Sequence, residues 1–305
     1  MVKTNSDTCV SFHINNNAFF GRLVRLDDVV NTIISRHNYP EVVSSVVAES
    51  VALAALLAST IKYEGLFTLQ TKSDGPISMV VVDVTSEGVI RASATYDEKR
   101  IEMARKLRKT EEEHEEAPHF LGHGYLAFTV DQGGPDKMYQ GVVDIQGKTL
   151  AECALRYFKQ SEQIDTALKL YVKAPEYNGD KWQSAGALLQ KLPEAGGKID
   201  ESIDIESLWE EAVVFLDSLR ADEVFNRELS SEELLHRLYH SNNLETSLHK
   251  NYRFGCRCSR EKLQAVLSSM SPEEVDSLAE KGKITAECSF CGEKYSFEKG
   301  ELLKQ

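Results

Sequence analysis

The sequence has little positive charge. Its 35 lysines and arginines are outnumbered by 48 aspartates and glutamates, which leaves a formal net charge of −13 at pH 7. A strongly acidic chain is repelled by nucleic acids and by anionic membrane surfaces. We therefore expect neither as a partner. A hydrophobic fraction of 42% nevertheless predicts an ordinary soluble globular protein.

An export signal is also missing from the pattern. No apolar run follows the polar start Met1–Asp7, so we expect no signal peptide. The longest apolar stretch, 42–61, contains Glu49 and several serines, which is typical of a buried helix rather than a membrane span. These features predict a cytoplasmic protein. In that reducing compartment, clustered cysteines indicate metal binding or redox chemistry more often than permanent disulfides.

Motifs for nucleotide binding and catalysis are absent too. The chain has no Walker loop, no Gly-x-Ser-x-Gly sequence and no paired-carboxylate signature. His236 and His240 are four residues apart on a predicted helix, but the glutamate that a metalloprotease needs does not lie between them. We therefore expect a protein that is not an enzyme and that uses no ATP.

Four of the six cysteines form two tight pairs near the C-terminus, and 29 residues separate the pairs. Four thiolates at such spacing can close a tetrahedral Zn²⁺ site with no open position, which is the geometry of a structural zinc. Gly292, directly after the second pair, would let the backbone turn beneath the metal. The predicted zinc ligands are Cys256, Cys258, Cys288 and Cys291.

The remaining two cysteines are isolated in the sequence. Cys153 follows Leu150 on one face of a predicted helix, so we expect it to be a small buried apolar side chain. Cys9 has no partner in its neighbourhood.

The first two thirds of the chain alternate strand patterns with a few helices. This mixture predicts an α+β core domain over residues 1–194. A charge-dense helix or loop at 97–116 is typical of a solvated face. The predicted helices are 40–62 and 149–163, and the predicted strands are 66–71, 77–82, 89–94, 125–130, 138–143, 167–172 and 185–192.

The segment 195–250 differs in kind from the core. It holds thirteen acidic and five basic residues, a net charge of −8. Apolar residues at helical spacing, such as Leu208 and Val213, and a capping box from Ser230 to Glu233 predict two helices. So short and acidic a segment needs a surface to pack on, so we interpret it as a conditionally folded helical linker. A stable helical subdomain is the alternative that the sequence leaves open.

Residues 251–305 are predicted to form a small α/β module around the metal. Ser259 begins one helix, and Ser271 with Pro272 and Glu274 begins a second that should end at Gly282. Two antiparallel helices would bring the cysteine pairs to one ion. The stretch 252–305 has nine basic and nine acidic residues, so it lacks the basic stripe of a nucleic-acid-binding zinc ribbon.

Nine short segments of the sequence form a recognisable set: 21–26, 36–40, 56–60, 69–70, 74–76, 139–141, 161–163, 256–261 and 288–292. Together they resemble the bacterial family of redox-regulated 33 kDa heat shock proteins, and the resemblance covers nearly the whole chain. The charged stretch 97–117 departs from the family pattern and looks inserted.

The resemblance implies a chaperone core at 1–194, a helical linker at 195–250 and a redox-switch zinc domain at 251–305. It implies an ATP-independent holdase that is inactive when reduced and zinc-bound. Oxidation would form the disulfides Cys256–Cys258 and Cys288–Cys291, release zinc and unfold the linker. Unfolded clients would then bind to an active homodimer and pass later to ATP-dependent refolding chaperones.

Two other functions fit the cysteine pattern. One is a constitutive zinc-ribbon module with inert cysteines that binds a protein or RNA partner. The other is a thiol–disulfide oxidoreductase that uses Cys288 and Cys291, although the thioredoxin-like βαβ context is missing. Release of zinc on mild oxidation would separate the redox switch from the constitutive module.

Overall fold

The computed structural model describes residues 6–108, 120–134, 137–191, 204–279 and 282–302. The chain clusters into two compact units, Met1–Phe254 and Gly255–Gln305. We call them the core unit and the C-terminal unit. The finer division at 194 and 250 stays a prediction.

The core unit contains two sheets. Sheet A has the strand order β10-β1-β2-β9-β8, and sheet B has the order β11-β5-β4-β3-β6-β7. Neighbouring strands are antiparallel except for β11 and β5. The strands are β1 Thr8–Ile14, β2 Phe19–Leu26, β3 Leu66–Ser73, β4 Ile77–Thr85, β5 Val89–Tyr96, β6 Gly124–Asp131, β7 Met138–Asp144, β8 Thr166–Lys173, β9 Gln183–Lys191, β10 Glu245–Asn251 and β11 Arg253–Phe254.

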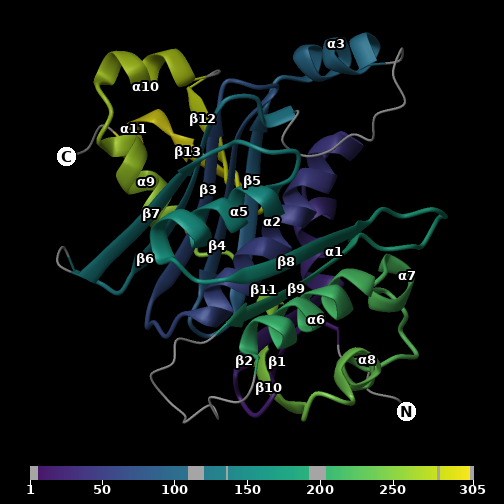
Figure 1. The fold of residues 1–305 in the computed structure, drawn as a ribbon. Coiled ribbons are helices and arrows are strands. Elements are labelled where there is room, and N and C mark those ends of the chain that lie inside the picture. The colour runs from purple at the N-terminus through teal and green to yellow at the C-terminus, as the bar shows by residue number, and fades with distance from the viewer. Residues whose placement is uncertain (1–5, 109–119, 135–136, 192–203, 280–281, 303–305) are drawn as a thin grey trace. The chain divides into compact units, whose positions relative to one another are not determined.

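The long helix α2, Glu41–Thr60, is the centre of the core unit. It contacts strands of both sheets, and Figure 1 shows it among them. Side chains on all its faces are buried, including Val47, Leu53 and Leu56. Length and composition would let α2 cross a membrane, but 89% of its most apolar window is buried inside the protein. The predicted buried helix is therefore confirmed.

This part of the core unit also contains the helices α1 Asp28–Ser35, α3 Glu98–Arg108 and α5 Leu150–Tyr157 and the π-helix η2 Phe158–Glu162. The charged helix α3 is fastened to the fold at its start. Ile101 is 2% exposed, and the Arg100 guanidinium donates to the carbonyl of Asp74 at 2.6 Å. The rest of the charged stretch, from 109 to 119, lies outside the described residues.

The acidic segment packs on the face of sheet A that α2 does not cover. It forms α6 Ile205–Ser218, α7 Ala221–Val224 and α8 Ser231–Tyr239, and it also supplies β10. Trp209 meets the ring of Phe19 edge-on at 5.3 Å, and Tyr239 stacks on Phe12 at 5.6 Å. Sheet A is therefore buried on both faces, one against α2 and one against the acidic segment.

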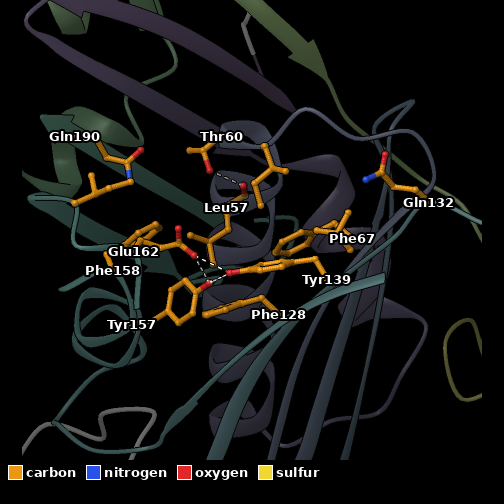
Figure 2. Close-up of a pocket in the computed structure, with 13 residues that line it drawn as sticks. Leu57, Thr60, Phe67, Phe128, Gln132, Tyr139, Tyr157, Phe158, Glu162 and Gln190 are labelled. Carbon is orange, nitrogen blue, oxygen red and sulfur yellow. Dashed lines mark hydrogen bonds between the residues drawn. The ribbon is translucent and has the colours of Figure 1, made fainter. Parts of the chain in front are cut away.

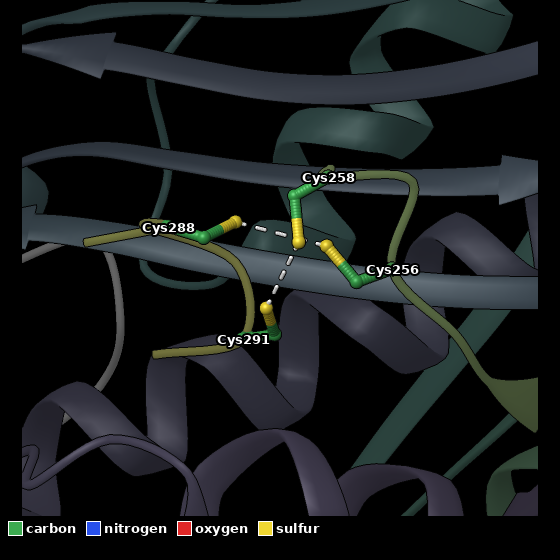
Figure 3. Close-up of side chains that lie close together, drawn as sticks. All are labelled: Cys256, Cys258, Cys288 and Cys291. Atoms are coloured by element: carbon green, nitrogen blue, oxygen red, sulfur yellow. Dashed lines mark hydrogen bonds between the residues drawn. The ribbon is translucent and has the colours of Figure 1, made fainter. Parts of the chain in front are cut away.

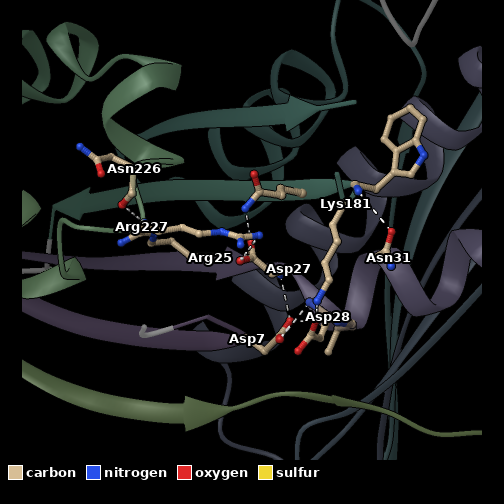
Figure 4. A network of polar contacts seen from close by, with 11 residues as sticks. Asp7, Arg25, Asp27, Asp28, Asn31, Lys181, Asn226 and Arg227 are labelled. Carbon is tan, nitrogen blue, oxygen red and sulfur yellow. Dashed lines mark hydrogen bonds and ion pairs between the residues drawn. The ribbon is translucent and has the colours of Figure 1, made fainter. Parts of the chain in front are cut away.

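A polar network fastens the acidic segment beside these apolar contacts (Figure 4). The buried guanidinium of Arg25 donates to the carbonyls of Asn226 and Leu229, each at 2.6 Å. Arg227 lies 3.6 Å from the carboxylate of Asp27. On β8, the hydroxyl of Tyr171 donates to the carbonyl of Leu219 at 2.6 Å. Three backbone carbonyls between α6 and α8 thus accept hydrogen bonds from side chains of sheet A.

The C-terminal unit has a small core of its own. Its elements are α9 Arg260–Ser268, α10 Pro272–Leu278, β12 Lys283–Glu287, β13 Lys294–Glu298 and α11 Lys299–Leu302. Ser259 caps α9, and the capping box of Ser271 and Glu274 with Pro272 begins α10, as predicted. The buried apolar cluster consists of Leu267, Val275, Ile284, Phe297 and Leu302.

Most predicted core elements are present, but some assignments need correction. The prediction that Gly282 ends the second helix is wrong, because α10 ends at Leu278. The acidic segment is not only helical: its end forms β10, which pairs with β1 from His13↔Glu245 to Thr8↔Asn251. The side chains of β10 are mostly exposed, so the segment lacks the alternating apolar pattern of a half-buried strand.

We predict that Gly21→Ala weakens the packing on the face of sheet A that the acidic segment covers. A Cβ at this position would lie 2.1 Å from Cζ of the fully buried Phe12, the ring on which Tyr239 stacks. Such overpacking costs about 1–3 kcal/mol. The midpoint of urea unfolding should therefore fall. Gly134→Ala is the control, because no atom lies within 4 Å of its added Cβ. Equal midpoints for the two variants would contradict this packing.

Candidate metal centre

The first cysteine pair lies on the extended chain between β11 and α9. Only Gly255 separates Cys256 from the last residue of β11. Cys258 immediately precedes Ser259, whose hydroxyl accepts a hydrogen bond from the backbone N–H of Lys262 at the start of α9. The Lys262 ammonium donates to the carbonyl of Arg257 between the two cysteines, at 2.9 Å. The helix cap and the ammonium together hold this short pair in place.

The second pair occupies the turn between β12 and β13. The N–H of Gly292 donates to the carbonyl of Cys288 at 2.8 Å, and the N–H of Cys288 donates to the carbonyl of Glu293 at 2.9 Å. Gly292 has a φ of +70°, which a residue with a Cβ rarely adopts. The predicted role of Gly292 in turning the backbone is confirmed. The turn directs both thiols to the same side.

The four sulfurs converge on one point (Figure 3). The Sγ atoms of Cys256 and Cys288 are 3.7 Å apart, and those of Cys258 and Cys291 are 3.5 Å apart. All four lie within 4.8 Å of one another. A tetrahedral zinc site with Zn–S bonds of about 2.3 Å requires neighbouring sulfurs about 3.8 Å apart. The arrangement therefore matches a closed four-thiolate site.

The thiols differ in how readily they ionise. Burial acts to raise the pKa of Cys256, but hydrogen bonds, led by the backbone N–H of Cys258, outweigh it and lower that pKa to about 7. Burial raises the pKa of Cys288 and Cys291 above the usual value for a thiol. A metal ion would favour all four thiolates, since the thiolate is the form that binds metal.

Tyr295 on β13 is a neighbour of the cluster that the sequence analysis missed. Its hydroxyl lies 3.3 Å from Cys258 Sγ. This hydrogen bond raises the pKa of Tyr295, so the phenol keeps its proton and can donate to the sulfur. A register count could have indicated this side of the hairpin, because Tyr295 pairs with Ala286, two residues before Cys288. Phe297, on the same face, is covered by the Arg260 guanidinium at 4.4 Å from the ring centroid.

Among the described residues, these four cysteines are the one group of His, Cys, Asp or Glu side chains that could hold a metal ion. The rings of His236 and His240 on α8 are exposed and 5.8 Å apart. Cys9 and Cys153 are fully buried in the core unit, as expected for Cys153. Burial raises the pKa of Cys9 to about 11, which makes it a poor nucleophile at neutral pH.

Comparisons with known proteins agree on one family. The family model described as Hsp33 protein matches residues 7–298. The 33 kDa chaperonin of Caulobacter vibrioides is 33% identical over 96% of this chain and 95% of its own length. That of Aliivibrio salmonicida is 34% identical over 91% and 88%. The crystal structure of the Thermotoga maritima 33 kDa chaperonin has the same fold, with a TM-score of 0.76, 22% identity and coverage of 97% and 96%.

We predict that the cluster binds one thiophilic divalent cation per chain. Co²⁺ titration of the reduced, metal-stripped protein, followed by thiolate-to-metal absorbance, measures its affinity. Cys288→Ser should abolish the tetrahedral spectrum, and Tyr295→Phe should lower the affinity about 10-fold, because it removes a hydrogen bond to a ligand sulfur. Cys153→Ser is the control. Unchanged Co²⁺ binding by Cys288→Ser would remove this cysteine from the ligand set.

Proposed function

The chain belongs to the Hsp33 protein family, and on that premise we propose that it is a redox-regulated, ATP-independent chaperone. It binds unfolding proteins and prevents their aggregation, and it is not an enzyme. The reduced, zinc-bound form is inactive. Disulfide formation and loss of zinc activate the protein in the cytoplasm under oxidative stress.

The observation that carries this proposal is the four-sulfur cluster in a unit with a small apolar core. Among its described residues, the C-terminal unit buries five apolar side chains in one cluster. Domains of this size rarely gain more than a few kcal/mol from a core, whereas a structural zinc supplies about 10 kcal/mol of folding free energy. With Cys256, Cys258, Cys288 and Cys291 as ligands, the fold of this unit depends on the metal.

Oxidation removes the ligands themselves. In the proposed reaction each disulfide, Cys256–Cys258 or Cys288–Cys291, forms when two thiolates give two electrons to one peroxide molecule, which takes up two protons and leaves as two waters. A disulfide sulfur is no longer a thiolate, so zinc is lost. Two short sulfur contacts of the cluster join Cys256 to Cys288 and Cys258 to Cys291. Disulfides within each pair would break these two contacts between the pairs.

The acidic segment is the second part of the proposed switch. It covers a continuous apolar face of sheet A that includes Val10, Phe12, Phe19 and Leu23, all 0–1% exposed. Release of α6, α8 and β10 would open this face and leave β1 as an exposed edge strand. Both features favour binding of unfolded chains. β10 runs through Tyr252 and β11 directly into Cys256, so the switch is covalently continuous with the segment.

The proposed partners are those that membership of the family implies. They are unfolded or misfolded client proteins, a second copy of the chain in an active homodimer, and ATP-dependent refolding chaperones downstream. Nucleic acids and membranes are not among them, because the net charge of −13 disfavours both.

The direct test measures light scattering of a heat-unfolding client with the reduced, zinc-loaded protein and with the protein after mild peroxide treatment. We expect only the oxidised protein to suppress aggregation, without ATP and with release of one zinc per chain. Cys153→Ser is the matched control and should switch normally, because this thiol is buried in the core unit. Equal suppression by the reduced and oxidised forms would refute the switch and favour a constitutive zinc module.

Release of the acidic segment has a separate signature. Val213→Asp should weaken the contact of α6 with sheet A by about 2 kcal/mol and give partial chaperone activity in reduced protein, because it places a charge in the apolar cluster. Val214→Asp is its control: Val214 is the next residue on the same helix and is 64% exposed.

Hydrogen exchange and Trp209 fluorescence follow this release in the wild-type protein. Oxidation should remove amide protection from 205 to 239 and move the Trp209 indole into water, since that indole now packs on Phe19. Unchanged protection after zinc loss would rule out the release mechanism, even with chaperone activity present.

A further inference from the structure

A cavity of about 390 Å³ lies in the core unit, between the end of α2 and the π-helix η2. Figure 2 shows the side chains that line it. Most of its lining is apolar and comes from α2 and the residue after it, β3, β6 and η2: Leu57, Ile61, Phe67, Phe128, Val130 and Phe158. This size and lining are those of a ligand site. No step of the proposed redox switch uses this cavity.

Three oxygen atoms meet at the mouth of this α2–η2 cavity. The hydroxyls of Tyr139 and Tyr157 lie 2.8 and 2.5 Å from Oε1 of Glu162, and 2.6 Å from each other. Burial, and then the hydrogen bond with Glu162, raises the pKa of Tyr157, so its hydroxyl stays protonated at neutral pH. Figure 2 shows both rings directing their hydroxyls to the one carboxylate.

The backbone of β7 and η2 positions Tyr157 and Glu162 for these contacts. A Cβ on Gly141 of β7 would lie 2.5 Å from the Tyr157 ring, so only glycine lets that ring lie against the strand. The wider turn of η2, closed by Gln163 in the left-handed conformation, carries Glu162 to the two hydroxyls. Such π-helical turns are rare in proteins, and those that occur often lie at functional sites.

The Glu162 carboxylate can accept more hydrogen bonds than the two tyrosine hydroxyls donate to it. Both hydroxyls meet Oε1, and among the described residues no cation pairs with Glu162 and no donor reaches Oε2. Two hydroxyl protons also serve three close oxygen pairs when Glu162 is ionised. An additional donor with positive charge would complete the group. The site therefore fits a ligand with an apolar body and a cationic donor.

The strand beside the cavity favours an extended peptide as that ligand. β7 is an edge of sheet B in the described structure and pairs there only with β6. Three of its apolar side chains are more than half exposed: Met138 at 59%, Tyr139 at 52% and Val142 at 51%. An extended chain can add to such an edge and place one side chain in a neighbouring pocket.

We propose that the α2–η2 cavity anchors unfolded client proteins: it holds one apolar side chain, and Glu162 pairs with a lysine or arginine next to it. This inference rests on the proposed chaperone function, for which it names a client-binding site and a client chemistry. The cavity is present while the acidic segment covers sheet A. One anchor alone binds weakly, and opening of sheet A adds a second contact on the same client, which multiplies the affinity.

The test uses fluorescein-labelled ten-residue peptides and the full-length, reduced, zinc-loaded protein, with fluorescence polarisation as the readout. One peptide carries leucine next to arginine, a second has glutamate in place of the arginine, and a third has serine in place of the leucine. The first should bind best. Glu162→Gln should weaken its binding about five-fold, the effect of one exposed ion pair, and should leave the glutamate peptide unchanged.

Two further variants test whether the effect is specific to Glu162 and to the cavity. Glu176→Gln removes an exposed carboxylate from the β8–β9 turn and should change nothing. Thr60→Phe fills the mouth of the cavity from the last residue of α2 and should weaken the first peptide without altering the charge. Equal losses in Glu162→Gln and Glu176→Gln, or no preference for arginine over glutamate, would overturn the proposal. So would binding of phenethylamine, a small amphipathic amine, without binding of the first peptide.

The two proposals fail separately. If oxidised protein suppresses client aggregation but no peptide depends on Glu162, the anchor site is wrong and the redox switch stands. If oxidation confers no activity while the first peptide still binds through Glu162, the redox switch is wrong and the cavity remains a peptide site.

Discussion

Sheet A has apolar side chains on both faces, and the architecture of the core unit depends on covering them. One face is covered by α2, a helix buried on nearly all sides. The other is covered by a segment with a net charge of −8. An acidic amphipathic segment packs on an apolar sheet through a narrow stripe while its charges stay in water. The apolar face of sheet A is therefore complete but covered.

The cover is held by contacts of two kinds. Aromatic pairs such as Phe12 with Tyr239 exclude water from the interface. The Arg25 guanidinium donates hydrogen bonds to backbone carbonyls that would otherwise be buried without donors. Both kinds of contact join the same segment to the same sheet, so the release proposed above would break them together.

The C-terminal unit has a four-sulfur cluster beside a small apolar core. Its core is small, and its four sulfurs come from two places in the chain that only the fold brings together. In the proposed switch, thiolates and a metal hold this unit, and oxidation consumes the same thiolates. The two buried cysteines of the core unit, with a pKa for Cys9 of about 11, are protected from the same oxidant.

The sequence by itself determined the local features of this protein. Capping residues such as Ser271, the apolar run of α2 and the close cysteine pairs are signals within one turn or one hairpin, so they could be read without the fold. Tertiary structure decided the rest. The strand β10 could not be predicted from the sequence, because its side chains are mostly exposed and its partner, β1, lies more than two hundred residues away. Tyr139, Tyr157 and Glu162 carry no motif, and they meet only because Gly141 and a π-helical turn let them approach. Long-range pairing and close backbone approach depend on the whole chain, and no local pattern encodes them.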